Sequence, residues 1–395
     1  MGVLLIGCSS SDDGAEAGEA SSTSSADATT TTEPVDPGEV VPGDDWVVAT
    51  PEEHGIDPAG LEEAREYAFA EGKETQGVVV VHGGEIVAEW YADGAGPDSW
   101  AASWSVAKSF TSAVVGIAIE EGEIPGVEEP MSTYIPGWAG TDREPITIRD
   151  VLHMASGLDW NEAYAGTAGE SQIVQMVTGE ADQLAYASVR PVRAPPGTAW
   201  NYSSGDSMLL SGVVEEATGR PLDDYATEVL LDPIGMQQVE WWRDVEGHTL
   251  GYCCFDTTSR DFARLGLLYA RDGRWGDEQV VPEAWVEESL VPLEASAGEY
   301  GYQWWLGEPD GVTVDVFSAQ GHDGQVILVV PVLDLVVVRN GTYVKDPGPP
   351  VADPTLFTRY PSDGIIPGRG TVPPDEWDDG ELLRPIIAAL GDAPR

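Results

Sequence analysis

Ser105-Val106-Ala107-Lys108 opens a mostly apolar run that continues to Ile119. If Ser105 starts a helix here, the side chains of Ser105 and Lys108 lie one turn apart on the same face. A lysine at the start of such a buried helix is partly desolvated, which favours a neutral amine able to take a proton from a neighbouring hydroxyl. The free N–H groups at the helix start can also receive a developing oxyanion. The stretch therefore indicates a serine nucleophile with a lysine base.

A purely structural interpretation fits the same four residues. Ser105 is a suitable helix N-cap, and Lys108 can extend along the helix to place its amine in water. The whole chain contains only three lysines, Lys73, Lys108 and Lys345, so a Ser-x-x-Lys spacing rarely arises by chance. The spacing alone leaves both interpretations open.

The segment before this run predicts a helix followed by a hairpin. Asp57-Pro58 is typical of a helix start and predicts a helix to about residue 70. The runs 77–81 and 85–91 are rich in strand-forming residues and are joined by Gly83-Gly84. Two such runs with a glycine turn between them predict two antiparallel strands.

The segment after it returns to strands only near the end of the chain. From about residue 105 to 290 the helical period dominates, without a convincing series of strands. Strand-like runs follow at 312–319, 324–330 and 333–339, before a last helix at about 381–390. We therefore expect an α+β fold with an antiparallel sheet assembled from both ends of the chain, flanked by N- and C-terminal helices, plus an all-helical lobe. Clefts between such lobes are common ligand sites.

The charge of the chain limits its partners. Its 395 residues include 69 acids and 19 bases, which give a formal net charge of −50 at pH 7. Nucleic acids and anionic membrane surfaces are polyanions that such a surface repels, so we expect neither as a partner. Salt screens repulsion among carboxylates, which fits a saline habitat as well as it fits an ordinary acidic exported protein.

Cysteine and histidine patterns favour neither a disulfide framework nor a metal site. The chain has three Cys, two of them adjacent (Cys253 and Cys254), and five scattered His without a His-Glu-x-x-His pattern. We expect no metal or other cofactor. We also expect both adjacent cysteines to be structural, because nothing nearby marks either thiol as a nucleophile. The pairs Trp241-Trp242 and Trp304-Trp305 are either cleft walls or core residues.

Residues 1–8 form a short apolar run, M-G-V-L-L-I-G-C, that ends at Cys8. It resembles the end of a bacterial lipoprotein signal, which implies a lipid on Cys8 and an exported protein anchored to a membrane by that lipid. No Lys or Arg precedes Arg65, so the basic segment of a secretory signal is missing and the true start is left open. An ordinary thiol at Cys8 is the alternative. Residues 9–45, rich in Ser, Thr and acids, predict a disordered spacer before a folded domain at 46–395.

Four further blocks accompany the Ser-x-x-Lys block along the chain. They are L-H-M-A-S-G-L at 152–158, N-Y-S-S at 201–204, Y-G-Y-Q-W-W at 300–305 and G-H-D-G-Q at 321–325. With these blocks the chain resembles the serine β-lactamase and penicillin-binding protein superfamily over nearly all of residues 50–345. Within it, the chain is most similar to the class C-like esterase and 6-aminohexanoate-dimer hydrolase branch. The resemblance implies a β-lactamase-like fold and hydrolysis through an acyl-enzyme.

The resemblance also implies a catalytic role for individual residues. Ser105 attacks a carbonyl, while Lys108 and the phenol of Tyr202 take the serine proton and pass it to the leaving group. The backbone N–H groups of Ser105 and Gln325 form the oxyanion hole. A core position for Tyr202 is the structural alternative.

The substrate-binding positions implied by the resemblance are His322, Gly324 and Ser204. Two of them depart from the family pattern. Ser204 stands where β-lactam-binding relatives have an Asn that contacts the substrate amide, and His322 stands where they have a Lys that faces a carboxylate. A histidine is mostly neutral at pH 7 unless its pKa is raised, so carboxylate recognition should be weaker here. A structural strand residue is the alternative for His322.

We therefore expect an exported serine hydrolase that cleaves small esters or amides. A D,D-peptidase or a β-lactamase is the alternative among enzymes. A catalytically silent binding lipoprotein is the alternative outside them, and the intact Ser105, Lys108 and Tyr202 argue against it.

Overall fold

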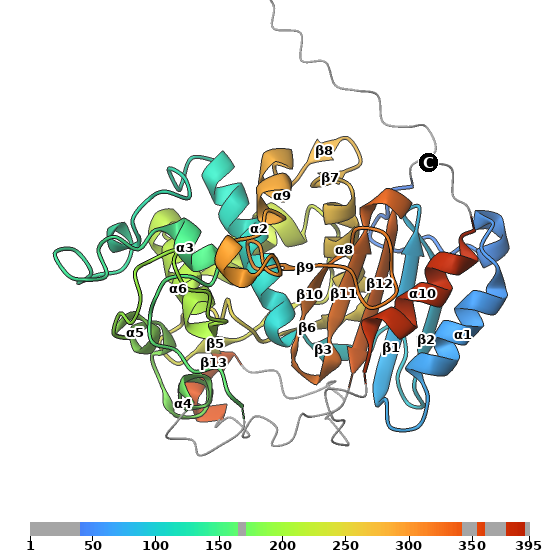
Figure 1. The fold of residues 1–395 in the computed structure, drawn as a ribbon, viewed down its shortest axis with the longest axis horizontal. Coiled ribbons are helices and arrows are strands. Elements are labelled where there is room, and N and C mark those ends of the chain that lie inside the picture. Colours follow the sequence, from blue (N-terminus) through green and yellow to red (C-terminus); the bar gives the residue numbers. More distant parts are fainter. Residues whose placement is uncertain (1–39, 165–170, 342–353, 360–376, 392–395) are drawn as a thin grey trace, which may run out of the picture. The chain divides into compact units, whose positions relative to one another are not determined.

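A six-stranded antiparallel sheet, in the order β2-β1-β12-β11-β10-β9, is the centre of the fold (Figure 1). The computed structural model describes residues 40–164, 171–341, 354–359 and 377–391. Cys8 and the spacer up to residue 39 lie outside this range. Val40 and Asp44, which we had assigned to the spacer, accept hydrogen bonds from Arg271 and Arg264 through their carbonyls, so the packed region starts before residue 46.

The N-terminal hairpin forms as predicted. β1 (Thr75–His82) and β2 (Glu85–Tyr91) pair in antiparallel register. The two linking residues, Gly83 and Gly84, have φ of +62° and +83°. Glycine adopts this left-handed region without the steric cost that a side chain brings, which explains the Gly-Gly turn.

The C-terminal strands complete the sheet. They are β9 (Trp305–Leu306), β10 (Phe317–Gln320), β11 (Val326–Val330) and β12 (Leu335–Gly341). β12 pairs with β1, so the sheet joins the two ends of the chain as expected. The predicted strand at 312–319 is shorter than expected, because only its last three residues lie in β10.

Both faces of the sheet are covered. Val78 and Val80 pack into one hydrophobic core, and Val79 and Val81 pack into the other. Because alternate side chains of a strand point to opposite faces, this valine run is what a strand buried on both sides requires.

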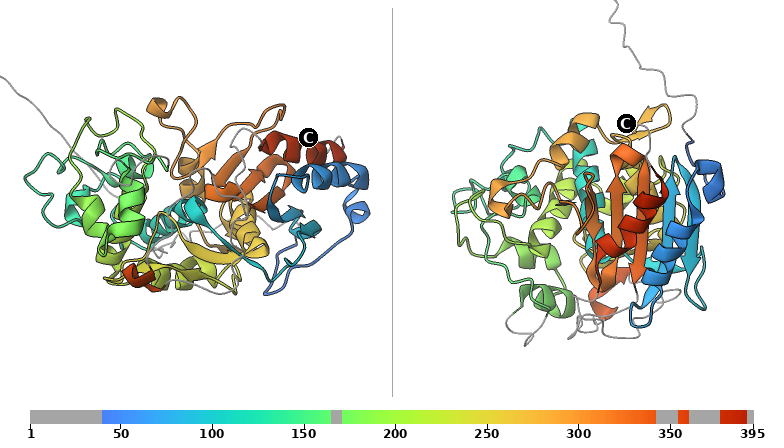
Figure 2. Two further views of the ribbon diagram at one scale, coloured as in Figure 1. Left: turned by 90° about the horizontal axis from the view of Figure 1, so that it is seen from below. Right: turned by 45° about the vertical axis from the view of Figure 1, so that its right-hand side comes forward.

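Helices from both ends of the chain cover the face of the sheet that carries Val78 and Val80. α1 (Pro58–Ala68) and α10 (Asp379–Ala389) pack side by side (Figure 2). The Asp57 carboxylate caps α1 by accepting a hydrogen bond from the Ala59 N–H at 3.0 Å. α8 (Ser259–Ala270) packs against β1, β11 and β12 on the other face.

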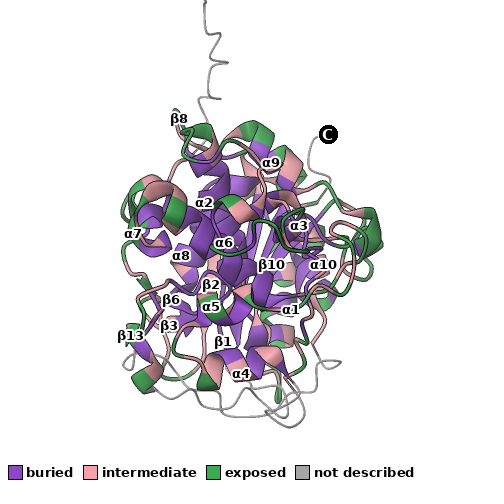
Figure 3. Cartoon of the chain, turned by 90° about the vertical axis from the view of Figure 1, so that its left-hand side faces the viewer, coloured by how far each residue is buried: buried purple, intermediate pink, exposed green. Residues whose placement is uncertain are grey.

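The second lobe is mainly helical. It contains α3 (Ile148–Leu152), α4 (Gln172–Gly179), α5 (Gln183–Ser188), α6 (Ser204–Thr218) and α7 (Leu222–Ala226). α2 (Ala107–Glu120) packs against α6, α7 and α9 (Glu283–Ser289). Almost all of α2 is buried, as Figure 3 shows by colour.

The region 105–290 is not free of strands, which corrects our expectation. Within it, β4 (Glu240–Trp241) and β6 (Phe255–Thr258) form a three-stranded sheet with β3 (Trp100–Ala102), which lies just before the region. Two further pairs are β5 (Arg243–Asp244) with β13 (Phe357–Arg359) and β7 (Arg274–Trp275) with β8 (Glu278–Gln279). These strands are too short to show a periodic pattern. Among the described residues, no helix combines the length and apolar character that a membrane crossing needs.

Candidate active site

Ser105 lies in a tight turn rather than in a regular helix. Residues Trp104–Val106 form a single 3-10 turn that leads from β3 into α2. Trp104 has φ of +44°, a left-handed conformation that is unfavourable for a residue with a side chain. The turn is held by Ser103, whose N–H donates to the Phe255 carbonyl at 2.7 Å. The backbone next to Ser105 is therefore strained and fixed by β6, a common feature of functional sites.

Lys108 lies one turn later and faces Ser105. Its Nζ donates to Ser105 Oγ at 2.9 Å, to Ser204 Oγ at 3.1 Å and to the Tyr252 carbonyl at 2.7 Å. Lys108 is 1% exposed. Burial lowers the pKa of Lys108 to about 8, against the opposing effect of the Glu162 carboxylate. A lysine in this environment is neutral in a usable fraction of molecules near neutral pH, as a base must be.

Tyr202 lies directly before Ser203, the N-cap of α6. Burial raises the pKa of Tyr202, and the Glu162 carboxylate raises it further, while a hydrogen bond with Ser105 lowers it. Lys108 Nζ lies 5.1 Å from the centre of the Tyr202 ring. The phenol thus stays protonated next to both the hydroxyl and the amine.

Aromatic side chains surround Tyr202. The Trp305 ring stacks on it, with ring centres 5.5 Å apart and planes 24° apart. Trp305 is half-buried, whereas the other members of the two tryptophan pairs, Trp241, Trp242 and Trp304, are buried in the core. Trp241, Trp242 and Trp304 are therefore core residues, and Trp305 is the member of the two pairs that packs on Tyr202.

Ser204 links Lys108 to an acid that we did not predict. Ser204 Oγ donates to Glu162 Oε1 at 2.6 Å, and its N–H donates to Glu162 Oε2 at 3.0 Å. Tyr164 also donates its hydroxyl to Glu162 Oε1 at 2.8 Å. The Ser204 hydroxyl is therefore engaged between a base and a carboxylate, so it is less available to a substrate amide than we expected.

The turn between β10 and β11 brings His322 close to Ser105 and Ser204. His322 lies in a 3-10 turn rather than on a strand. Its Nδ1 is 2.8 Å from Asp323 Oδ1, while Nε2 has no hydrogen-bond partner among the described residues. Asp323 Oδ2 also accepts a hydrogen bond from Trp104 Nε1 at 2.8 Å. One carboxylate therefore orients both the histidine ring and the residue before the nucleophile.

Gly321 allows this turn to approach the nucleophile. A Cβ at Gly321 would lie 2.5 Å from the Ser103 carbonyl oxygen, closer than real contacts allow. The close approach of the two backbones thus requires a glycine here.

Gln325 and Gly324 have different positions in the turn. The Gln325 N–H donates to the His322 carbonyl at 3.4 Å, a long bond that a better acceptor can replace. Its side chain is tied to Gly341 by two hydrogen bonds. The Gly324 carbonyl accepts from Arg339 Nη1 at 2.9 Å. Gly324 is not among the residues that line the pocket next to Ser105.

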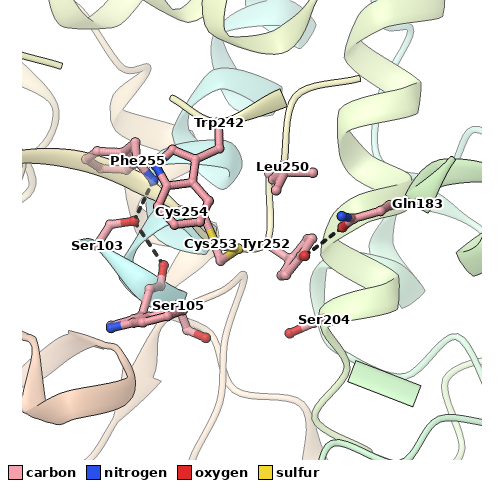
Figure 4. Close-up of a disulfide and its surroundings, with 12 residues drawn as sticks. Ser103, Ser105, Gln183, Ser204, Trp242, Leu250, Tyr252, Cys253, Cys254 and Phe255 are labelled. Carbon is pink, nitrogen blue, oxygen red and sulfur yellow. Dashed lines mark hydrogen bonds between the residues drawn. A yellow bond between two sulfur atoms is a disulfide. The ribbon is translucent and has the colours of Figure 1, made fainter. Parts of the chain in front are cut away.

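A small pocket opens beside Ser105 and has a cavity volume of about 30 Å³. Its apolar wall comes from α4 and from Cys253. The lining residues are Trp104, Ser105, Tyr164, Ile173, Val174, Val177, Ser204, Tyr252, Cys253 and His322. Cys253 and Cys254 form a disulfide (Figure 4), which we had not expected of two structural thiols. A cavity of this size holds about two water molecules, so it suits a small apolar group.

Comparisons with known proteins identify the family of this chain. A family model described as Beta-lactamase matches residues 65–356. The chain belongs to the β-lactamase family. A relative of this β-lactamase-family chain, the 6-aminohexanoate-dimer hydrolase of Paenarthrobacter ureafaciens, is 28% identical over 285 residues, which are 67% of this chain and 72% of the relative.

Two solved structures share the fold of this β-lactamase-family chain. A D-stereospecific amidohydrolase from Streptomyces sp. has a TM-score of 0.55 at 20% identity, with 72% of this chain and 94% of that chain covered. EstCE1, a hydrolase with promiscuous acyltransferase activity, has a TM-score of 0.59 at 16% identity, with 72% and 93% covered.

Most residues that we predicted for this β-lactamase-family site lie together. Ser105, Ser204 and His322 line one pocket. Lys108 does not line it but donates hydrogen bonds to Ser105 and Ser204, and its amine lies beside the Tyr202 ring. Sequence reasoning missed the residues that complete the arrangement around Lys108, namely Glu162, Tyr164 and Tyr252. Nothing in its spacing distinguishes Glu162 among 69 acids, and only the fold brings it to Ser204.

Proposed function

We propose that this chain is a serine hydrolase that cleaves small esters or amides through an acyl-enzyme on Ser105. The observation that carries the proposal is the 2.9 Å contact between Ser105 Oγ and the buried amine of Lys108, whose pKa is lowered to about 8. The name of the relative from Paenarthrobacter ureafaciens supports an amide as one substrate class.

The residues suggest the following order of steps. Neutral Lys108 accepts the proton of Ser105 Oγ while the oxygen attacks the substrate carbonyl. The carbonyl oxygen becomes an oxyanion, to which the N–H groups of Ser105 and Gln325 donate. The carbon–leaving-group bond then breaks, and the leaving group takes the proton from Lys108 through the Tyr202 phenol. A water molecule then attacks the carbonyl of the acyl-enzyme and gives a proton to Lys108. The bond between the acyl carbon and Ser105 Oγ breaks, Ser105 Oγ regains a proton, and the acid is released.

The first test is labelling and turnover of variants. Ser105→Ala should lose fluorophosphonate labelling and ester turnover, because the proposed acyl-enzyme forms on the Ser105 hydroxyl. Lys108→Ala should lose about 10²- to 10⁴-fold in kcat/KM. Lys73→Ala is the matched control: it removes a lysine that packs on Tyr67 and Trp377 instead, so it should retain turnover. A Ser105→Ala protein that keeps more than about a tenth of wild-type turnover would overturn the proposal.

The second test separates ester hydrolysis from β-lactamase or D,D-peptidase activity, the runner-up functions. A β-lactam presents an amide and a carboxylate, but the Ser204 hydroxyl is already bonded to Glu162, and His322 replaces the family lysine. Losing one charge-assisted contact costs about 1.5–3 kcal/mol. We expect kcat/KM for p-nitrophenyl acetate to exceed that for nitrocefin by about a hundredfold at pH 7.5. Nitrocefin as the better substrate would favour the runner-up.

A further inference from the structure

One short segment of backbone touches both the nucleophile turn and the base. The Tyr252 carbonyl accepts the 2.7 Å hydrogen bond from Lys108 Nζ. Three residues later, the Phe255 N–H donates to Ser103 Oγ at 3.0 Å, and the Phe255 carbonyl accepts from the Ser103 N–H at 2.7 Å. The positions of Lys108 and of the turn before Ser105 therefore both depend on the conformation of residues 252–255.

The disulfide lies between these two anchors. Cys253 and Cys254 are 4% and 1% exposed, and Figure 4 shows their sulfurs between Ser103, Tyr252 and Phe255. A bond between neighbouring cysteines closes a small covalent ring that includes the peptide bond joining them, so it removes rotational freedom from this part of the backbone. Cys254 has φ of +71°, a left-handed conformation that is uncommon for a residue with a side chain, so the ring closes at a strained backbone position.

The other contacts of the segment hold its flanks. The Tyr252 hydroxyl donates to Gln183 Oε1 at 2.7 Å, and the Trp242 N–H donates to the Cys254 carbonyl at 2.9 Å. The Gly251 carbonyl accepts from Thr111 Oγ1 of α2 at 2.7 Å. Because these hydrogen bonds hold the flanks, opening the disulfide ring should change the backbone conformation mainly in the two peptide units next to the ring. One of these peptide units carries the Tyr252 carbonyl.

We propose that the Cys253–Cys254 disulfide is a positioning pair for Lys108, and that its reduction slows acyl transfer by Ser105. The proposal rests on the proposed function. A dithiol such as dithiothreitol supplies two electrons and two protons: the S–S bond breaks, two S–H bonds form, and the dithiol becomes a cyclic disulfide. The reduced segment is free to leave the left-handed conformation at Cys254. Lys108 then loses its fixed acceptor, and the amine is no longer held toward Ser105 Oγ.

The test compares the oxidised and reduced full-length chain. The protein is reduced with dithiothreitol, freed of reductant by gel filtration without oxygen, and assayed with p-nitrophenyl acetate. Alkylation after denaturation, followed by peptide mass spectrometry, reports the state of both cysteines. We expect kcat to fall by about tenfold or more, and by a larger factor than any change in KM. The reason is that displacement of the base acts on the chemical step, whereas Tyr252 and Cys253 are only two of the ten residues that line the pocket. Reoxidation should restore kcat.

Cys253→Ser combined with Cys254→Ser is the matched control. This variant should show the low kcat of the reduced protein and no response to dithiothreitol. A thermal melt followed by circular dichroism compares its fold with the wild type. If the variant does not fold, the reduced wild-type protein decides the question.

The outcomes separate this proposal from the proposed function. If oxidised protein is labelled by a fluorophosphonate at Ser105 and the fully reduced protein has the same kcat, the positioning role alone is overturned. A fall in kcat that accompanies unfolding, and is not restored by reoxidation, overturns it too. Oxidised protein without labelling at Ser105 overturns the proposed function and this proposal together.

Discussion

At the scale of single residues, burial and Glu162 act in opposite directions on the pKa of Lys108. Burial lowers it to about 8, and the carboxylate raises it through the charge interaction. With this pKa, roughly one lysine in ten is neutral at pH 7, and most are neutral at pH 9. Because the reaction needs the neutral amine, kcat/KM for a neutral ester should rise with pH through this range and then level off.

Glu162→Gln tests this balance. The change removes the charge that raises the pKa of Lys108 and keeps the size of the side chain, so the rise of kcat/KM should move to lower pH. The measurement is a pH profile of kcat/KM for p-nitrophenyl acetate. Glu123 is an exposed acid just after α2 and provides the control. Glu123→Gln should keep the midpoint of the wild-type pH profile. A Glu162→Gln profile with an unchanged midpoint would show that Glu162 does not act on Lys108.

Whether a site residue could be predicted from the sequence depends on how the fold brings it to the site. Ser105 and Lys108 are close in the chain, so local geometry brings them together and their spacing is readable. Tyr252 reaches Lys108 with its backbone carbonyl, a group that every residue carries, so no sequence signal could mark it. The adjacent cysteines were visible, but their bond depends on a backbone conformation at Cys254 that composition does not reveal.

At the scale of elements, the approach of the β10–β11 turn to the nucleophile turn is a tight fit. Gly321→Ala places a methyl group 2.5 Å from the Ser103 carbonyl oxygen, closer than real contacts allow, so one of the two backbones must shift, and these backbones carry Ser105 and His322. A shift of this kind at a catalytic group costs about ten- to a hundredfold in kcat/KM. Turnover of p-nitrophenyl acetate measures it.

Gly96→Ala is the control for this change. A Cβ at Gly96 meets nothing within 4 Å, so turnover should be unchanged. Equal activities of Gly321→Ala and Gly96→Ala would mean that the turn adjusts without disturbing the site.

Long elements were predictable and short ones were not. The hairpin β1–β2 follows from a valine-rich run and a Gly-Gly turn, which local preferences fix. β3 and β4 have three and two residues, too few for an alternating pattern, and they exist because β6 lies between them. Tertiary pairing of this kind outweighs intrinsic strand preference.

At the scale of the whole molecule, we propose that the protein is exported and anchored through a lipid on Cys8. With a complete upstream signal, wild-type protein should incorporate a clickable palmitate analogue in a bacterial host, because the Leu-Ile-Gly-Cys run that ends at Cys8 resembles the end of a bacterial lipoprotein signal. Labelled protein is measured by in-gel fluorescence of the membrane fraction. Cys8→Ser should carry no label, and label that persists in Cys8→Ser would contradict the proposal.

The pairing of β1 with β12 sets the order in which a newly made chain becomes an enzyme. Thr75 pairs with Gly341, so β1 leaves the ribosome long before its central partner exists. Ser105, Lys108 and Tyr202 are all translated in that interval, but the turn that carries His322 and Gln325 comes only with the last strands. Closing so long a loop is slow. A nascent chain therefore carries Ser105 well before it carries Gln325, the second N–H donor of the oxyanion hole that we propose. We accordingly expect hydrolysis to begin only after β10, β11 and β12 have been translated and β12 has paired with β1.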